Sequence, residues 1–159
     1  MASTAAHEPD WAQKLHAHGL KVTQPRLAVL RTLNRHPHSS AEQIVELADQ
    51  RPATLSVQSV YNVLADLRAE KLVRSLELPH RPGLYELDHR DNHHHAVCTN
   101  CDAVADVPCA VGASPCLTPL DNHGILVEIA DVLYRGLCAA CRDSNQTNEN
   151  NNNLTGDLA

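Results

Sequence analysis

Two identical cysteine pairs constrain the fold of this 159-residue chain more than any other feature of its sequence. Cys98 and Cys101 form the first pair, and Cys138 and Cys141 repeat the same Cys-x-x-Cys spacing. One turn of backbone can present both sulfurs of such a pair to a single ion, and two pairs complete the tetrahedral sulfur set that Zn²⁺ prefers. We therefore predict a structural zinc site, and two separate redox motifs or disulfides are the alternative.

The composition favours two small domains over one large one. The chain has no Phe, one Trp and three Tyr, so Leu, Val, Ile and Ala must supply the hydrophobic core. A length of 159 residues suits one or two domains. A small domain with little apolar bulk gains stability from a structural metal, which agrees with the predicted zinc site.

Charge is distributed unevenly between the two halves of the chain. Residues 1–80 carry nine Lys or Arg against eight Asp or Glu, whereas residues 81–159 carry four against eleven. Only the first half is therefore suited to a polyanion such as DNA. Its excess is small, so DNA binding would depend on a few placed cations, helix N-termini and doubled valency.

The first half predicts four short helices, each with a start signal. Asp10 precedes a helix that stops at Gly19, and Thr23 caps a second helix with Pro25 in its first turn. The third begins at Ser39 or Ser40, and residues 51–52, Arg-Pro, are expected to end it. In this third helix we expect Glu42 to act in a capping box. Its expected buried stripe consists of Ile44, Val45, Leu47 and Ala48.

The fourth predicted helix opens at Ser56, and two short extended segments follow it. Its apolar residues recur at helical spacing: Val60, Val63, Leu64 and Leu67. The extended segments, residues 72–78 and 84–87, are separated by Pro79, Pro82 and Gly83, as in a two-stranded wing. Residues 1–83 are thus interpreted as a winged helix-turn-helix domain, and a plain helical bundle is the alternative.

In a winged-helix domain the fourth helix would enter the major groove of double-stranded DNA. Amide side chains on it could read adenine edges, while hydroxyl groups and cations at the rim could hold phosphates. The seven expected DNA-contacting residues are Lys21, Arg26, Ser56, Gln58, Ser59, Tyr61 and Asn62.

The second half predicts a small sheet. Residues 94–98, 103–107 and 125–135 are rich in Val, Ile or Leu and are expected to be strands. Residues 108–124 contain several prolines and glycines and are expected to form a loop with at most a short helical turn. Residues 84–92 are then a hinge region, residues 93–143 a metal-binding domain, and residues 144–159 an Asn-rich disordered tail.

The run of three histidines before the first cysteine pair suggests a second metal site. On a strand, His93 and His95 project to one face and His94 to the other. Oxygen ligands from Glu86 and Asp106 and an imidazole from the N-terminal half could join them. The predicted regulatory ligands are His38, Glu86, His93, His95 and Asp106. Such mixed ligation suits Fe²⁺, Mn²⁺ or Zn²⁺; solvated surface histidines are the alternative.

These features resemble those of the ferric uptake regulator (Fur) family of bacterial metalloregulators. The resemblance extends from about Trp11 to Cys141. Residues 109–117, Cys-Ala-Val-Gly-Ala-Ser-Pro-Cys-Leu, are similar to the actinobacterial FurA type in particular. The other segments that carry the resemblance are Val-Thr-Gln-Pro-Arg at 22–26, His-Pro-His-Ser-Ser-Ala-Glu at 36–42, Ser-Val-Tyr at 59–61, Tyr-Glu at 85–86, residues 91–98 and both cysteine pairs.

The resemblance implies an α+β protein with an N-terminal winged helix-turn-helix domain and a small C-terminal α/β dimerisation domain stapled by four-cysteine zinc. It further implies a homodimeric, metal-dependent transcriptional repressor that binds operator DNA, with structural Zn²⁺ and a separate regulatory Fe²⁺ or Mn²⁺. The five regulatory ligands named above match the family's sensing positions. An ion shared by the two domains would then fix the spacing of two recognition helices.

The resemblance allows either iron sufficiency or peroxide as the signal that the protein senses. An Asp at position 106 is similar to the peroxide-sensing branch of the family, and FurA-type members typically repress a catalase-peroxidase gene. We therefore favour oxidative stress as the signal. An iron-uptake or zinc-uptake repressor of the same family is the alternative, and a metal-buffering protein or a metalloenzyme is a further one. We find no motif of a metalloenzyme in the sequence.

Two cysteines stand outside the paired motifs. Cys109 and Cys116 could form a redox couple or be ordinary thiols. The family's additional His/Asp/Glu metal site is incomplete, because its positions fall near Asn92, His94, Ala113 and Ala130. We expect a cytoplasmic protein without a membrane partner, because the sequence has neither an apolar signal region nor about 20 continuous apolar residues.

Overall fold

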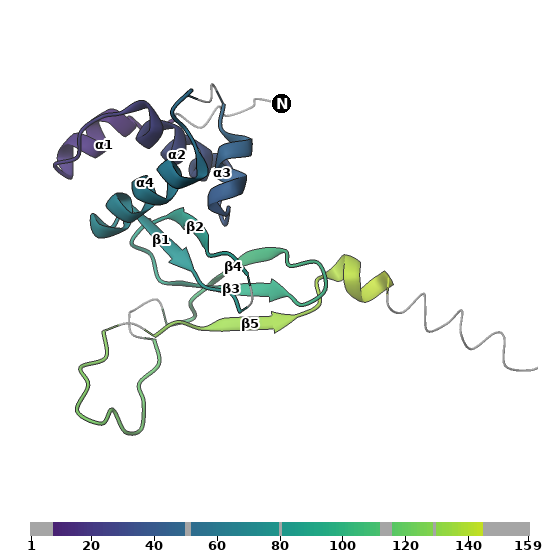
Figure 1. Ribbon diagram of the computed structural model, residues 1–159. Helices are drawn as coiled ribbons and strands as arrows, with labels where there is room; N and C mark the ends of the chain where they lie inside the picture. Colours follow the sequence, from purple (N-terminus) through teal and green to yellow (C-terminus); the bar gives the residue numbers. More distant parts are fainter. Residues whose placement is uncertain (1–7, 50–51, 80, 112–115, 129, 145–159) are drawn as a thin grey trace, which may run out of the picture. The chain divides into compact units, whose positions relative to one another are not determined.

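The computed structural model describes residues 8–49, 52–79, 81–111, 116–128 and 130–144. The chain divides into two compact units, Met1–His89 and Arg90–Ala159 (Figure 1). Within these described residues the first unit contains four helices and a two-stranded sheet, and the second contains a three-stranded sheet followed by a short helical segment at 139–144. The expected mixed α+β class is confirmed.

Each helix of the first unit begins at a side-chain cap. The helices are α1 (Trp11–Ala17), α2 (Gln24–Arg35), α3 (Ala41–Leu47) and α4 (Val57–Ala69). The capping residues, whose side chains accept a backbone N–H from the first turn, are Asp10, Thr23, Ser40 and Ser56. These short polar residues satisfy N–H groups that have no partner inside the helix, which fixes where each helix starts.

Helix α3 differs from the sequence-based expectation in three respects. The capping box of Ser40 uses Gln43 rather than Glu42, because Gln43 stands at the third helical position while Glu42 stands at the second. The helix ends at Leu47, well before residues 51–52, and Ala48 is already extended. Leu47 is 42% exposed, so its predicted place in the buried stripe is wrong.

The hydrophobic core of the first unit is built from all four helices and both strands. Helix α4 contributes the predicted stripe of Val60, Val63, Leu64 and Leu67, all of which are buried. This apolar stripe leaves the polar side of α4 free of core packing.

Strands β1 (Val73–Leu76) and β2 (Leu84–Leu87) form the predicted wing. They pair antiparallel, with Arg74 opposite Glu86. Ser39, in the connection between α2 and α3, exchanges two backbone hydrogen bonds with Tyr85 of β2 (3.2 and 2.9 Å). This isolated bridge holds the connection containing His38 against the wing.

The sheet of the second unit consists of β3 (His93–Cys98), β4 (Val104–Pro108) and β5 (Leu133–Gly136), in the order β4-β3-β5. Strand β3 pairs antiparallel with β4 and parallel with β5. The expected strand over 125–135 is wrong for most of its length, because strand pairing with β3 begins at Leu133, just after the Val132 carbonyl accepts from the His95 N–H (3.4 Å), and the described residues 125–128 and 130–131 lie outside any strand. In the described part of 108–124 the loop contains no helical turn.

The second unit buries few apolar side chains. Among its described residues the buried ones are Cys98, Cys141 and His94, at 4, 9 and 6% exposure. Its exposed large hydrophobic residues are Val111, Leu117, Leu120, Ile125, Leu126, Tyr134 and Leu137. A unit with so little apolar core needs another source of stability.

In the part of the chain that the structure describes, no helix combines the length and hydropathy of a membrane span. Of the Asn-rich tail predicted at 144–159, all but the first residue lies outside the described residues.

Candidate metal centres and nucleic-acid interface

The four paired cysteines converge at one end of the sheet in the second unit. Cys98 is the last residue of β3, Cys101 lies in the turn to β4, Cys138 follows β5, and Cys141 lies in the segment 139–144. Their four sulfurs all lie within 4.8 Å of one another. The Cys101 and Cys138 sulfurs are 3.7 Å apart, which matches the separation of about 3.8 Å between two sulfurs that share a tetrahedral Zn²⁺.

Backbone geometry positions and polarises these sulfurs. Asp102 adopts a left-handed conformation (φ 63°), and its N–H donates to the Cys98 carbonyl (3.0 Å), which closes the turn carrying Cys101. The Cys138 N–H donates to the Cys98 sulfur (3.3 Å). This bond, with further backbone N–H groups of Cys101 and Asn100, lowers the pKa of the Cys98 thiol to about 6.

Crowding of the sulfurs shifts the pKa of the Cys101 thiol in the opposite direction. The Ala103 N–H lowers the pKa of this thiol, but the neighbouring sulfurs of Cys98, Cys141 and Cys138 outweigh it and raise the pKa to about 12. Four sulfurs this close repel one another as thiolates, and a divalent cation removes that repulsion. The predicted four-cysteine site is therefore present, and its donor set fits structural zinc.

In the first unit, the partly buried His38 lies beside the buried Glu86. His38 Nε2 lies 2.9 Å from Glu86 Oε2, and the two side chains are 10% and 5% exposed. Arg74 Nε donates to the other carboxylate oxygen of Glu86 at 2.5 Å. His38 itself is left-handed (φ 57°), a conformation uncommon for a residue other than glycine. Sequence reasoning missed Arg74, which only the β1–β2 register reveals.

In the second unit, His93, His95 and Asp106 lie on one face of the sheet, as the strand alternation predicts. The two imidazole rings are 4.9 Å apart, and their Nε2 atoms lie 3.6 and 3.7 Å from Asp106 Oδ1. Asp106 is the cross-strand partner of His95. Ligands that share one ion at about 2.1 Å lie about 3 to 3.5 Å apart, so these three groups fit one ion.

A second carboxylate orients this cluster. Asp91 Oδ2 lies 3.1 Å from His93 Nδ1, which leaves Nε2 of that ring directed toward Asp106. Imidazole ligands of metals commonly make this kind of outer contact. Sequence reasoning did not assign Asp91 a role at this site. The available signal was the position of this carboxylate, two residues before the histidine run.

His94 faces the other side of β3, as predicted. Its Nε2 atom lies 3.3 Å from the sulfur of Cys116, and Cys109 lies close to both. Ala113, one of the positions matched to an additional family site, lies outside the described residues.

On α4, the expected DNA-reading side chains lie on the exposed polar side. Gln58 and Asn62 are exposed, one helical turn apart and joined by a hydrogen bond from Gln58 Nε2 to Asn62 Oδ1 (3.4 Å). Tyr61 is 38% exposed, and its hydroxyl donates to Glu42 (3.4 Å). These three groups have the chemistry and exposure that base and phosphate contacts require.

The remaining expected DNA contacts also have structural roles. Ser56 and Ser59 cap the N-terminus of α4 through reciprocal hydrogen bonds of 3.2 and 2.8 Å. Arg26 donates to the Lys21 carbonyl (2.8 Å) and forms an ion pair with Asp66 of α4 (2.5 Å). This ion pair joins α2 to α4, and its two residues are 40 positions apart in the sequence. Sequence reasoning missed Asp66, because a contact at this separation leaves no local signal.

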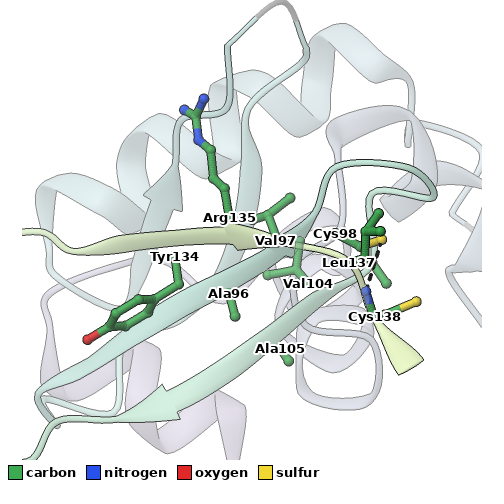
Figure 2. Close-up of a pocket in the computed structure, with 11 residues that line it drawn as sticks. Ala96, Val97, Cys98, Val104, Ala105, Tyr134, Arg135, Leu137 and Cys138 are labelled. Atoms are coloured by element: carbon green, nitrogen blue, oxygen red, sulfur yellow. Dashed lines mark hydrogen bonds between the residues drawn. The ribbon is translucent and has the colours of Figure 1, made fainter. Parts of the chain in front are cut away.

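An apolar pocket of about 320 Å³ opens on the sheet of the second unit (Figure 2). Ala96, Ala105 and Tyr134 are cross-strand neighbours in its lining, and Val97 and Val104 are the next such pair. Leu137 adds a further apolar side chain beside Cys138. The pocket therefore belongs to the same unit that exposes most of the large hydrophobic residues.

Comparison with known proteins supports the resemblance found in the sequence. Residues 17–110 match the family model described as "Ferric uptake regulator family". The chain is 45% identical over 133 residues to "Transcriptional regulator FurA" of Mycobacterium tuberculosis, covering 84% of this chain and 90% of that protein.

Two solved structures show the same fold. The ferric uptake regulator of Vibrio cholerae superposes with a TM-score of 0.63 at 23% identity, covering 81% of this chain and 100% of that one. The peroxide stress regulator of Campylobacter jejuni gives a TM-score of 0.59 at 27% identity, covering 84% and 100%.

Proposed function

Because the chain belongs to the ferric uptake regulator family and is of the FurA type, we propose that it represses transcription by binding operator DNA as a metal-loaded homodimer. The relatives that match most of its length are named as transcriptional regulators, which are not enzymes. One observation carries the proposal: a winged-helix unit with an exposed polar recognition helix belongs to the same chain as a preformed imidazole and carboxylate cluster.

The proposed regulatory ion takes two ligands from the first unit, His38 and Glu86, and three from the second, His93, His95 and Asp106. Support comes from each half separately. The first supplies a partly buried imidazole beside a buried carboxylate, and the second supplies two imidazoles and a carboxylate oxygen within 3.7 Å. Nitrogen and oxygen donors suit Fe²⁺ or Mn²⁺, and Zn²⁺ is compatible with them as well.

An ion with ligands in both units would limit their relative orientation and so the spacing of two recognition helices in a dimer. Metal binding and DNA binding would then be coupled. Linkage makes this coupling reciprocal: the factor by which metal tightens operator binding equals the factor by which operator tightens metal binding.

Exposed apolar surface supports the homodimer. Among the described residues of the second unit, seven large hydrophobic ones are exposed, and an apolar pocket opens on its sheet. Single apolar residues on a surface are ordinary, but a unit that buries so little and exposes so much is typical of an interaction surface. We therefore assign dimerisation to the second unit.

We favour peroxide over iron sufficiency as the signal that the protein senses. The protein would then act in the cytoplasm and control a catalase-peroxidase gene. Asp106 at a ligand position and the similarity to the Campylobacter jejuni peroxide stress regulator support this assignment. A ligand histidine should then gain one oxygen atom when peroxide meets the Fe²⁺ form but not the Mn²⁺ form. An iron-uptake or zinc-uptake repressor would use the same site without that oxidation.

A gel-shift experiment tests the proposal. The full chain is mixed with DNA from upstream of its own gene in Fe²⁺, Mn²⁺ or Zn²⁺, before and after peroxide, with a scrambled duplex as control. We expect metal-dependent binding to the upstream DNA that peroxide abolishes for Fe²⁺ and leaves intact for Mn²⁺. Equal binding to both duplexes under all conditions would contradict the repressor and favour a metal buffer.

A further inference from the structure

A third group of metal-ligating side chains lies on the face of β3 opposite His93 and His95. It consists of His94, Cys109 and Cys116, whose ligand atoms all lie within 4.8 Å of one another. None of the three belongs to the four-cysteine set or to the proposed regulatory set. Sequence reasoning left the two cysteines as a redox couple or ordinary thiols and did not connect them with His94.

The sheet fixes two of these ligands. His94 pairs with Val107 of β4, and two residues further along the chain the N–H of Cys109 donates to the Asn92 carbonyl (3.3 Å), so the ladder continues past the end of β4. His94 is 6% exposed, and its ring lies edge-on to Tyr134 of β5, with centroids 6.4 Å apart. The imidazole is thus held by both neighbouring strands before any ligand binds.

The third ligand comes from the loop after β4. Cys116 is partly buried, and its sulfur lies 3.3 Å from His94 Nε2. A sulfur and a nitrogen that share a tetrahedral Zn²⁺ are about 3.6 Å apart, so little movement separates this geometry from coordination. Burial, followed by a hydrogen bond with Cys109, raises the pKa of the Cys116 thiol. A cation reverses that effect, since metal-bound thiols lose their proton.

We propose that His94, Cys109 and Cys116 form a second thiolate metal site that binds Zn²⁺ through two sulfurs and one nitrogen. Two thiolates balance the charge of the ion, and three protein ligands leave the fourth tetrahedral position for water or another small ligand. The site differs in chemistry from the proposed regulatory site, which has no sulfur, and this difference makes the two separable by experiment.

Cobalt provides the probe, because a thiolate bound to Co²⁺ gives a sulfur-to-metal charge-transfer absorption that nitrogen and oxygen ligands do not. The full chain, with its four-cysteine site filled by zinc, is titrated with Co²⁺ under reducing conditions. Zinc content measured afterwards must remain one per chain, which shows that cobalt has not replaced the structural ion. We expect a charge-transfer band whose final intensity corresponds to one thiolate-bound Co²⁺ per chain, and Zn²⁺ added in excess should remove it.

Variants assign the band to these residues. The double variant Cys109→Ser and Cys116→Ser should lose the band, and His94→Gln should weaken cobalt binding by at least tenfold. The matched control His123→Gln replaces an exposed histidine of the same unit, 81% exposed in its side chain, and should change nothing.

Circular dichroism shows whether each variant stays folded. Cobalt binding without a charge-transfer band, or a band that survives in the double variant, would overturn the proposal. So would a Cys109–Cys116 disulfide that re-forms in air while the reduced protein binds no Co²⁺ through sulfur.

Discussion

Removal of zinc should unfold the second unit and leave the first unit folded. The first unit has a continuous apolar core from α1 to β2, whereas the described part of the second unit buries two cysteines and one histidine. The second unit therefore depends on the four-cysteine ion, and the first does not. The perturbation is the substitution Cys98→Ser in the full chain, with His123→Gln, at an exposed histidine of the same unit, as the control.

The size of the effect follows from the number of sulfurs. Structural zinc contributes on the order of 10 to 16 kcal/mol in small zinc domains. Shared equally among four sulfurs, one sulfur is worth about 3 kcal/mol, roughly a hundredfold in zinc affinity. While free zinc exceeds the dissociation constant of the site, each tenfold fall in free zinc removes a further ~1.4 kcal/mol from the stability of the second unit. Cys98→Ser should thus lose its zinc to a chelator concentration about a hundredfold lower than the parent protein requires.

Two readings distinguish the units. Trp11 is the only tryptophan, lies in α1 and is 3% exposed, so its fluorescence reports on the first unit alone. Amide hydrogen exchange of residues 93–108 and 133–141 reports on the second. We expect zinc loss to abolish protection in those peptides while the urea midpoint from Trp11 fluorescence stays the same. The reasoning would be refuted if metal analysis shows complete loss of zinc and the amides of β3 to β5 are still protected from exchange.

Three other predictions address the remaining contacts. His93→Ala should abolish metal-dependent operator binding, measured by fluorescence anisotropy, while circular dichroism is unchanged; identical binding curves would exclude His93 as a regulatory ligand. Arg74→Met should lower the free energy of unfolding of the first unit by about 2 kcal/mol, because Glu86 is buried and loses a charged partner. Arg31→Met, which removes the exposed ion pair with Glu8, should cost less than about 1 kcal/mol. Equal urea midpoints for the two variants would show that the Arg74–Glu86 pair stabilises the first unit no more than an exposed pair does. Zinc binding should release close to one more proton per ion at pH 5 than at pH 7, because the pKa of Cys98 is lowered to about 6 and its sulfur is therefore a thiolate before metal binds at neutral pH. Calorimetry in buffers of different ionisation enthalpy measures this number. A constant number across pH 5 to 8 would contradict the assigned pKa.

Local signals in the sequence predicted the first unit well. Capping residues such as Thr23 and Ser56 determine helix starts through their own side chains, and the apolar spacing of α4 identifies its buried side. The wing followed from two extended segments around prolines. Each of these features depends on residues within one or two turns of each other, which a sequence displays directly.

Features that depend on pairing between distant segments were harder to predict. Residues 125–135 have the composition of a strand, but among the described residues of this range strand structure begins where Leu133 pairs with β3. The predicted extent was wrong because composition does not reveal the partner. The ion pair of Arg26 with Asp66 depends in the same way on how α2 packs against α4.

The metal-ligating residues divide along the same line. The four cysteines could be predicted because the spacing within each pair is local and two pairs make a complete set. The relation of His94 to Cys109 and Cys116 could not, because it needs the β3–β4 register and the return of the loop after β4. The five proposed regulatory ligands came from strand alternation and from the family resemblance, and they remain a prediction.

The coupling between metal and operator is the most direct test of the proposed repressor. We propose measuring the dissociation constant for operator DNA with and without Mn²⁺, and the dissociation constant for Mn²⁺ with and without the operator, at one salt concentration. Allosteric couplings are typically about 5- to 150-fold. We predict the same factor in both directions for the parent protein and a factor of one for His93→Ala. Operator affinity that is equal with and without metal in the parent protein would contradict the account.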